Sequence, residues 1–236
     1  MRRVLFWCHL SAGLAAGLVI LLMSATGLLL AFQPQILEII DGPVRRVAVP
    51  AGGRPRVDVA AILASAAATR PGTAPTGVAL DADPEVAALV TFGRDAVYVD
   101  PHTGQVRGQG STAARAAFQK LTDWHRWLGV GAGSAWRANA RMVTGASNLL
   151  FLGLAVSGLY LWMPRTWNWN WIRTMTRFDL RSRGKARDFN WHHVIGFWCA
   201  PVLIVLTASA AVLSYPWAND LLYRLVGSPP PSAAGP

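Results

Sequence analysis

The chain has 236 residues, of which 53% are hydrophobic and only 14% are charged, and its formal net charge is +10. This composition excludes an ordinary soluble domain of this length, because too few polar side chains are available to cover a folded surface. No recognised nucleic-acid-binding motif accompanies the positive charge, so we expect no nucleic-acid partner. An integral membrane protein is the class that the composition favours.

Three uncharged segments are each long enough to cross a bilayer as a helix. They are Leu10 to Phe32, Val143 to Met163, and Val194 to Tyr215, and about 20 apolar residues suffice for one crossing. The first segment follows Met1-Arg2-Arg3 but is longer than the apolar core of a cleavable signal peptide, so we expect a retained signal anchor. The sequence therefore predicts a membrane α-helical bundle of three transmembrane helices within the lipid bilayer.

The basic residues predict how the helices are oriented. The loop from Pro164 to Trp191 holds seven Lys or Arg residues against two Asp, and Arg2 and Arg3 precede the first span. Basic residues beside a span stay on the cytoplasmic side. We therefore predict a multi-pass protein of the bacterial inner (cytoplasmic) membrane, with a cytoplasmic N-terminus and a periplasmic C-terminus. The tryptophans between Trp162 and Trp171 are typical of an interfacial aromatic belt.

The segment between the first two spans has a different composition, with charges, prolines and glycines. Short runs of β-type residues follow an alanine-rich helical stretch at Val57 to Thr69, and Asp100 to Gly104 has the composition of a tight turn. We predict a small extracytoplasmic α+β module with an antiparallel sheet. His102 lies in the predicted turn and is expected to be exposed.

Seven segments are predicted in all. In chain order they are transmembrane helix 1 (1–34), the extracytoplasmic α+β module (35–110), a membrane-surface amphipathic helix and linker (111–141), transmembrane helix 2 (142–163), a basic cytoplasmic loop (164–191), transmembrane helix 3 (192–216), and an extracytoplasmic, partly disordered tail (217–236).

Three of the five histidines share one local pattern, in which a Trp stands just upstream and a Gly follows four residues later. The pairs are His9 with Gly13, His125 with Gly129, and His192 with Gly196. The first and third spans align when shifted by 183 residues, which places His9 on His192. Because both spans run in the same direction, these two histidines are predicted at similar depth, near the cytoplasmic face and facing one gap.

A histidine in a spanning helix is costly and points to a function. Three explanations fit the spacing: axial ligation of a haem, which needs one or two protein ligands; structural histidines that only pack; and a proton relay or other ion site. A zinc site needs more ligands, usually four. Gly13 and Gly196 would leave room for a macrocycle.

The three-span layout and these motifs resemble the PepSY-associated transmembrane family over roughly residues 1 to 225. The resemblance also includes Ser157-Gly158-Leu159-Tyr160-Leu161-Trp162-Met163-Pro164, at the end of the second span, and the Asp100–Gly104 hairpin. It implies a PepSY-like fold for the α+β module. Members include iron-regulated inner-membrane proteins, some of which are haem-b reductases that reduce ferric siderophores on the periplasmic side.

The resemblance also implies roles for residues here. His9, His125 and His192 match the haem-ligating histidines, with His9 and His192 as an inner pair, whereas His193 stands where the family often has Arg. One haem b is implied, or two if His125 ligates an outer haem, either as a five-coordinate site or with a ligand from a partner subunit or another copy of the chain. Longer members carry a further PepSY segment and a fourth span.

Residues and resemblance together predict a haem-b membrane electron-transfer protein, an oxidoreductase of the ferric reductase type or a subunit of one, acting in iron uptake. Its donor would be a cytoplasmic reductant or a quinol, and its acceptor an extracytoplasmic ferric chelate. One alternative is a membrane-anchored PepSY interaction or regulatory protein without redox activity, since PepSY-type modules are associated with restraining peptidases. A third possibility is an accessory subunit of an iron-uptake transporter.

Overall fold

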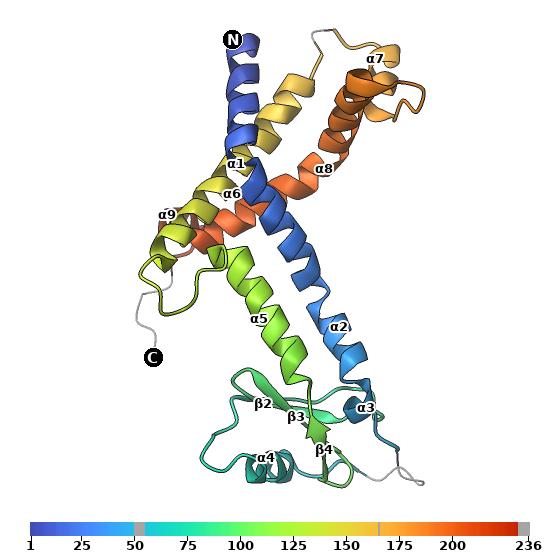
Figure 1. The fold of residues 1–236 in the computed structure, drawn as a ribbon, viewed down its shortest axis with the longest axis vertical. Coiled ribbons are helices and arrows are strands. Elements are labelled where there is room, and N and C mark those ends of the chain that lie inside the picture. Colours follow the sequence, from blue (N-terminus) through green and yellow to red (C-terminus); the bar gives the residue numbers. More distant parts are fainter. Residues whose placement is uncertain (50–54, 165, 231–236) are drawn as a thin grey trace. The chain divides into compact units, whose positions relative to one another are not determined.

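The computed structural model describes residues 1–49, 55–164 and 166–230. The elements follow one another along the chain as shown in Figure 1. They are α1 (Arg2–Ala31), α2 (Gln33–Ile40), α3 (Gly42–Arg45), α4 (Val59–Ala68), β1 (Gly77–Ala79), β2 (Ala88–Phe92), β3 (Asp95–Val99), β4 (Val106–Gln109), α5 (Thr112–Trp127), α6 (Arg137–Trp162), α7 (Trp169–Thr176), α8 (Gly184–Ser214) and α9 (Pro216–Leu225).

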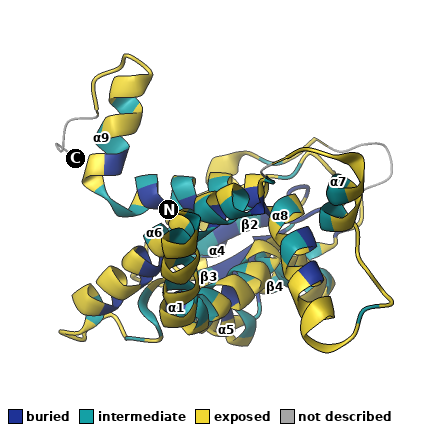
Figure 2. Cartoon of the chain, turned by 90° about the horizontal axis from the view of Figure 1, so that it is seen from above, coloured by how far each residue is buried: buried dark blue, intermediate teal, exposed yellow. Residues whose placement is uncertain are grey.

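Helices α1, α6 and α8 are the three described helices that are long and apolar enough to cross a membrane. Each contains all but the last residue of a predicted span, so the helical membrane class is confirmed. Each also begins earlier than its apolar run, because polar residues such as those at Gly184–His193 continue the helical backbone. Most side chains of these helices are exposed or half-buried (Figure 2), as expected of surfaces that face lipid.

The chain divides into two compact units, and the first consists of residues 1–24 and 126–236. In it, α1 runs antiparallel to α6, because Arg2 donates to the carbonyls of Leu161 and Met163 (2.6 and 2.5 Å) while His9, further along α1, meets Ser157.

Helices α6 and α8 are antiparallel as well. Asn148 donates to the Thr207 carbonyl at 2.9 Å, while Trp162 at the other end of α6 stacks on Phe197 at 4.2 Å. Small residues allow the close approach, since a Cβ on Gly145 would lie 2.6 Å from the Tyr215 hydroxyl. It follows that α1 and α8 run in the same direction, as the repeat predicts.

The basic loop after α6 contains a short helix and folds back onto α8. Helix α7 begins at Trp169 because the Asn168 side chain accepts a hydrogen bond from the Trp171 amide at 2.7 Å, an N-cap. Buried Asn190 of α8 then donates to the carbonyls of Thr174 and Arg177. These bonds satisfy the end of α7 and fix the loop to the helix that follows it.

The second unit, residues 25–125, contains a four-stranded antiparallel sheet in the order β1-β2-β3-β4. Alternation along β2 directs Val90 toward α4, where it packs with Val97, Val99 and Ile62 in a fully buried core. Strands β2 and β3 are joined by a two-residue turn in which Gly93 has φ +64°, the backbone that a tight hairpin requires. The predicted antiparallel α+β arrangement is confirmed as a small sheet with one covering helix.

A buried carboxylate joins the segments that flank this sheet. Asp41, 2% exposed, accepts hydrogen bonds from the Ser111 amide (2.7 Å), the Arg115 guanidinium (2.7 Å) and the Tyr98 hydroxyl (3.0 Å). Burial alone would raise the pKa of Asp41, but the three donors lower it more, so its pKa lies below the ordinary value. For Tyr98, burial and the charge of Asp41 both raise the pKa.

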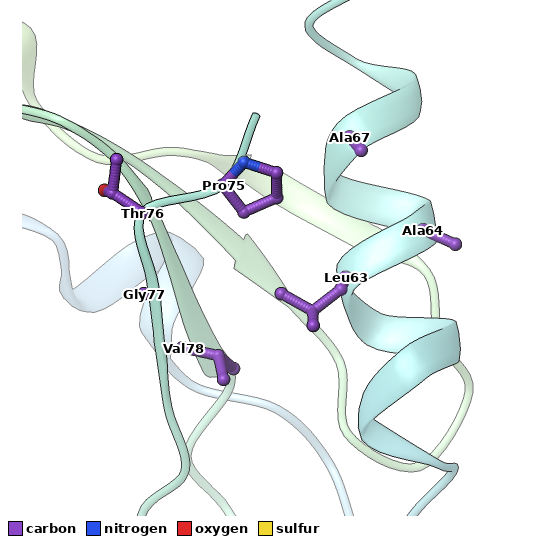
Figure 3. A pocket seen from close by; sticks show the side chains of 7 residues that line it. All are labelled: Leu63, Ala64, Ala67, Pro75, Thr76, Gly77 and Val78. Atoms are coloured by element: carbon purple, nitrogen blue, oxygen red, sulfur yellow. The ribbon is translucent and has the colours of Figure 1, made fainter. Parts of the chain in front are cut away.

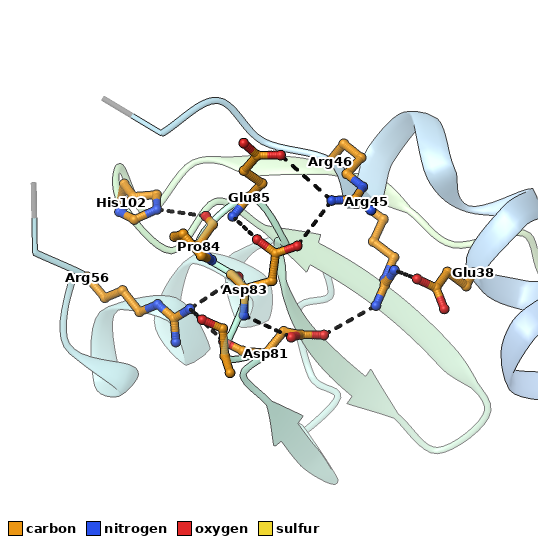
Figure 4. Close-up of polar contacts among 10 residues, drawn as sticks. Glu38, Arg45, Arg46, Arg56, Asp81, Asp83, Pro84, Glu85 and His102 are labelled. Carbon is orange, nitrogen blue, oxygen red and sulfur yellow. Dashed lines mark hydrogen bonds and ion pairs between the residues drawn. The ribbon is translucent and has the colours of Figure 1, made fainter. Parts of the chain in front are cut away.

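The prediction for His102 is wrong, because this residue is 4% exposed. Its backbone N–H donates to the Asp100 carboxylate at 2.8 Å, which confirms the predicted turn. That turn directs the imidazole inward, and Nε2 lies 3.0 Å from the Pro84 carbonyl. Figure 4 shows this contact beside a set of ion pairs that includes Arg45 with Asp81 and Arg46 with Asp83.

The sequence analysis missed four helices, α2, α3, α7 and α9. Pro34 and Pro216 each lie in the first turn of a helix, α2 and α9, where a missing N–H costs nothing. The predicted tail therefore begins as a helix, which ends at Leu225. The part of the predicted disordered stretch after residue 230 lies outside the described residues.

Candidate functional site

Two of the predicted ligands, His9 of α1 and His192 of α8, lie side by side. Their ring centroids are 6.5 Å apart and the ring planes make an angle of 80°. The two rings therefore lie at the same level of their helices, as the 183-residue repeat predicts. His9 is half-buried, while His192 is exposed on α8 and makes no hydrogen bond to any described residue. Both nitrogens of the His192 ring are thus available within the described part of the chain.

Ser157 of α6 orients the His9 ring. The Ser157 hydroxyl lies 2.9 Å from His9 Nδ1 and donates to the Leu154 carbonyl at 3.3 Å. With the hydroxyl proton on the Leu154 carbonyl, the Ser157 oxygen can accept from Nδ1–H, and in that tautomer Nε2 carries the lone pair. A hydrogen bond to one imidazole nitrogen is the arrangement that prepares the other to bind a metal.

The spacing of the two rings fits one metal ion between them. Metal–imidazole bonds are about 2 Å long, and a ring with bonds of about 1.3 Å has its centroid about 1.1 Å from each atom. Two axial imidazoles would then have centroids roughly 6.2–6.4 Å apart, against the observed 6.5 Å. Within the described residues no three His, Cys, Asp or Glu side chains come together. A pair of histidines is a donor set compatible with a haem, which needs one or two protein ligands.

The predicted glycines differ in what surrounds them. A Cβ on Gly196 would meet no atom within 4 Å, and one on Gly13 would touch only Leu154, at 4.0 Å. Gly158 of α6 is the glycine that contacts a histidine here, since its Cβ would lie 3.3 Å from His9 Cε1. The open space beside Gly196 is compatible with a bulky group next to His192.

His125 of α5 has its contacts elsewhere, with the far end of α1. Its Nδ1 lies 3.1 Å from the Thr26 hydroxyl, and a Cβ on Gly27 would lie 3.0 Å from its Cε1. Thr26 follows His9 by 17 residues in α1, which is about 25 Å of helix rise. His125 therefore makes its contacts at a different level of α1 from His9.

His193 adjoins His192 but has contacts of its own. Its ring centroid is 4.2 Å from that of Phe189 and 6.2 Å from that of His192. It lines a cavity together with Arg2 and Trp162. The sequence analysis left the role of this residue open, and the structure assigns it to the wall of that cavity.

Sequence reasoning missed Ser157 and Thr26 as the hydrogen-bond partners of His9 and His125. A partial signal for Ser157 was present, because it lies near the end of the second span, six residues before Met163, at the same predicted membrane face as His9. The contact of Thr26 with His125 has no such signal, because it depends on where α5 lies.

The α+β unit has a groove of its own between α4 and the edge strand β1. It has a volume of about 490 Å³, and Leu63 and Ala67 of α4 face the segment from Pro75 to Val78 across it (Figure 3). Its lining is mainly apolar, and none of the described residues that form it has a titratable side chain. The groove offers an apolar surface for packing.

Fold and site together define a helical membrane protein in which two parallel helices bring a pair of histidines together. The sequence matches the PepSY-associated TM region family over residues 6–236, and the chain belongs to that family. The predicted resemblance is confirmed by this match. No curated protein matches the sequence significantly.

Proposed function

We propose that the chain is a haem-b-binding electron-transfer protein of the bacterial inner membrane, of the ferric-chelate reductase type. The observation that carries this proposal is the His9–His192 pair, whose ring centroids are 6.5 Å apart. Two histidines without further ligands suit a haem, which needs only axial protein ligands, and do not suit a structural zinc ion. The basic loop would face the cytoplasm, as the distribution of Lys and Arg predicts.

In this proposal the haem supplies one-electron redox chemistry, and the protein holds it. His9 and His192 would hold the haem iron, with Ser157 holding the His9 ring in a fixed orientation. The mainly apolar helices would exclude water, and this exclusion would, together with the two histidines, tune the reduction potential. His125 would hold a second haem only with a ligand from a partner subunit or as a single axial ligand.

The acceptor would be a ferric chelate on the extracytoplasmic side. Hard oxygen ligands bind Fe³⁺ more tightly than Fe²⁺, so transfer of one electron loosens the chelate and releases the iron. The donor would be a cytoplasmic reductant or a membrane quinol.

Visible spectroscopy of the purified full-length protein in mild detergent tests the proposal. We expect a Soret band and α and β bands that sharpen when dithionite is added. His9→Ala and His192→Ala should each abolish the haem held by the pair, while His102→Ala, which removes a histidine outside the spans, should keep it. A colourless preparation from haem-replete cells, or full haem content in both variants, refutes the proposal.

Ser157→Ala gives a finer test, because it keeps both proposed ligands. Loss of a hydrogen bond to a metal-ligating histidine weakens metal binding about 10–100-fold, so haem should be lost faster to an acceptor such as apomyoglobin. Ser209→Ala is the matched control, since that exposed hydroxyl donates only to Leu206 of its own helix. Equal rates of haem loss in the two variants would show that Ser157 does not support a ligand.

A second function is favoured by the groove between α4 and β1. An apolar groove beside an exposed edge strand can accept an extended peptide, which suits a membrane-anchored PepSY interaction or regulatory protein. A colourless protein that co-purifies with a peptide or peptidase lost on Leu63→Asp would support this function instead.

A further inference from the structure

A second cavity lies where α1, α6, α7 and α8 meet, outside the His9–His192 pair. Its volume is about 290 Å³, near the lower end of small-molecule sites. Both polar and aromatic side chains line it, among them Arg2, Trp162, Asn168, Trp171, Met175 and His193. We call it the Arg2–His193 cavity.

One wall of the Arg2–His193 cavity is aromatic and fixed. Trp162 is 8% exposed, stacks on Phe197 at 4.2 Å and 18°, and meets the Trp171 ring edge-on at 4.7 Å and 70°. Its indole N–H points to the Met175 carbonyl at 3.5 Å. A planar ring entering the cavity therefore meets aromatic surfaces that are already ordered, which reduces the entropic cost of binding.

The polar groups of the cavity retain hydrogen-bonding capacity. Arg2 uses only Nη2 for the carbonyls of Leu161 and Met163, so Nη1 and Nε keep N–H donors within the described part of the chain. Asn168 uses its oxygen as the α7 cap, which leaves its amide NH₂ as a donor. His193 adds an imidazole that can donate or accept. Three separate polar groups around an aromatic wall suit a flat ring with oxygen atoms on opposite edges.

The polar groups named above suit a neutral ring. The guanidinium of Arg2 and the amide NH₂ of Asn168 can each donate to a carbonyl or hydroxyl oxygen. The ends of the three spanning helices beside the basic loop are also where the headgroup of a membrane-dissolved molecule would lie. A neutral, oxygen-bearing ring with an apolar tail meets both conditions.

We propose that the Arg2–His193 cavity binds the headgroup of a membrane quinone or quinol. Its role as the entry point for electrons rests on the proposed function, since His193 adjoins His192, one of the proposed haem ligands, with ring centroids 6.2 Å apart. Oxidation of one quinol to quinone releases two electrons and two protons. The electrons reduce two ferric irons to ferrous in succession, and the protons pass to water at the cytoplasmic end. Binding itself does not depend on the haem.

Isothermal titration calorimetry of the purified full-length protein with decylubiquinone, in detergent, tests binding. We expect saturable binding in the micromolar range. Trp171→Leu should weaken it about tenfold through loss of the aromatic wall, and Asn168→Asp, which keeps the cap but replaces the NH₂ donor by oxygen, should weaken it by a similar factor. Trp169→Leu is the matched control, because Trp169 lies in the same helix but is 74% exposed and should leave the affinity within about twofold.

Three outcomes overturn the proposal: no saturable binding, equal weakening by Trp169→Leu and Trp171→Leu, or displacement of the quinone by phosphatidylglycerol at equal concentration, which would assign the cavity to a lipid phosphate. The His9→Ala variant separates this inference from the proposed function. If the wild-type protein contains no haem, but both it and His9→Ala bind decylubiquinone, the proposed haem is refuted and the quinone site is kept. A haem protein that binds no quinone would do the reverse.

Discussion

Removal of the Asp41 carboxylate should open the α+β unit. Asp41→Ala would leave the Arg115 guanidinium, whose side chain is 13% exposed, without its buried partner, and would deprive Tyr98 and the Ser111 amide of their acceptor. Removing one partner of a buried ion pair costs about 3–5 kcal/mol. Since 1.36 kcal/mol corresponds to a factor of ten, amide exchange in β3 should become about 150- to 5,000-fold faster.

Hydrogen–deuterium exchange of the full-length protein in detergent, read by mass spectrometry on peptides covering Asp95–Val99, measures this change. Asp58→Ala is the control, because Asp58 is exposed and caps α4 without a side-chain hydrogen bond, and it should change the opening free energy by no more than about 0.5 kcal/mol. Asp41→Asn keeps one oxygen that can accept from the Ser111 amide, so its exchange rate should fall between those of Asp41→Ala and Asp58→Ala. If Asp41→Ala and Asp58→Ala exchange alike, the reasoning about the buried carboxylate is wrong.

Three further predictions follow from single contacts. The pKa of Asp41 is lowered on folding, so its stabilising contribution is present above its ordinary pKa of 3.8 and is lost as the pH falls below that value. The difference in amide exchange rate between wild type and Asp41→Asn should therefore shrink below about pH 4. Gly27→Val should crowd His125 and cost about 1–3 kcal/mol, or roughly 3–10 °C in Tm, whereas Gly17→Val, where a Cβ meets nothing within 4 Å, should leave Tm unchanged or slightly higher. Asn148→Ala should weaken the packing of α6 on α8 by about 0.6–2 kcal/mol in an SDS titration; an unchanged midpoint would mean that its bond to the α8 carbonyl contributes nothing net.

The spanning helices and the sheet were predictable because their signals are local. A run of more than about 20 uncharged residues has few alternatives to a membrane helix, and short β-type runs separated by turn residues predict hairpins. The helix starts were missed because polar residues outside the apolar run are equally good helix formers. Hydropathy reports the part of a helix that suits lipid, whereas the backbone of α8 begins at Gly184, ten residues before that part.

The polar contacts were less predictable because they join residues far apart in the chain. Asp41 meets partners 57, 70 and 74 residues away, and no local pattern marks an aspartate as buried. His102 was misplaced for the same reason, since a turn composition says where the backbone reverses and not which side chain faces inward. The His9–His192 pair was found because an internal repeat supplies long-range information that a single segment lacks.

The hydrogen bond between His9 and Ser157 spans 148 residues of sequence, and this separation affects how the protein is made. At a synthesis rate of about 5–20 residues per second, α1 emerges about 7–30 s before the end of α6. During that interval its imidazole lies in or beside the bilayer without the hydroxyl that later orients it, a costly state for a polar side chain. Assembly therefore proceeds by insertion first and helix pairing second, and α1 depends during this delay on lipid headgroups, on water at the interface or on an insertion factor.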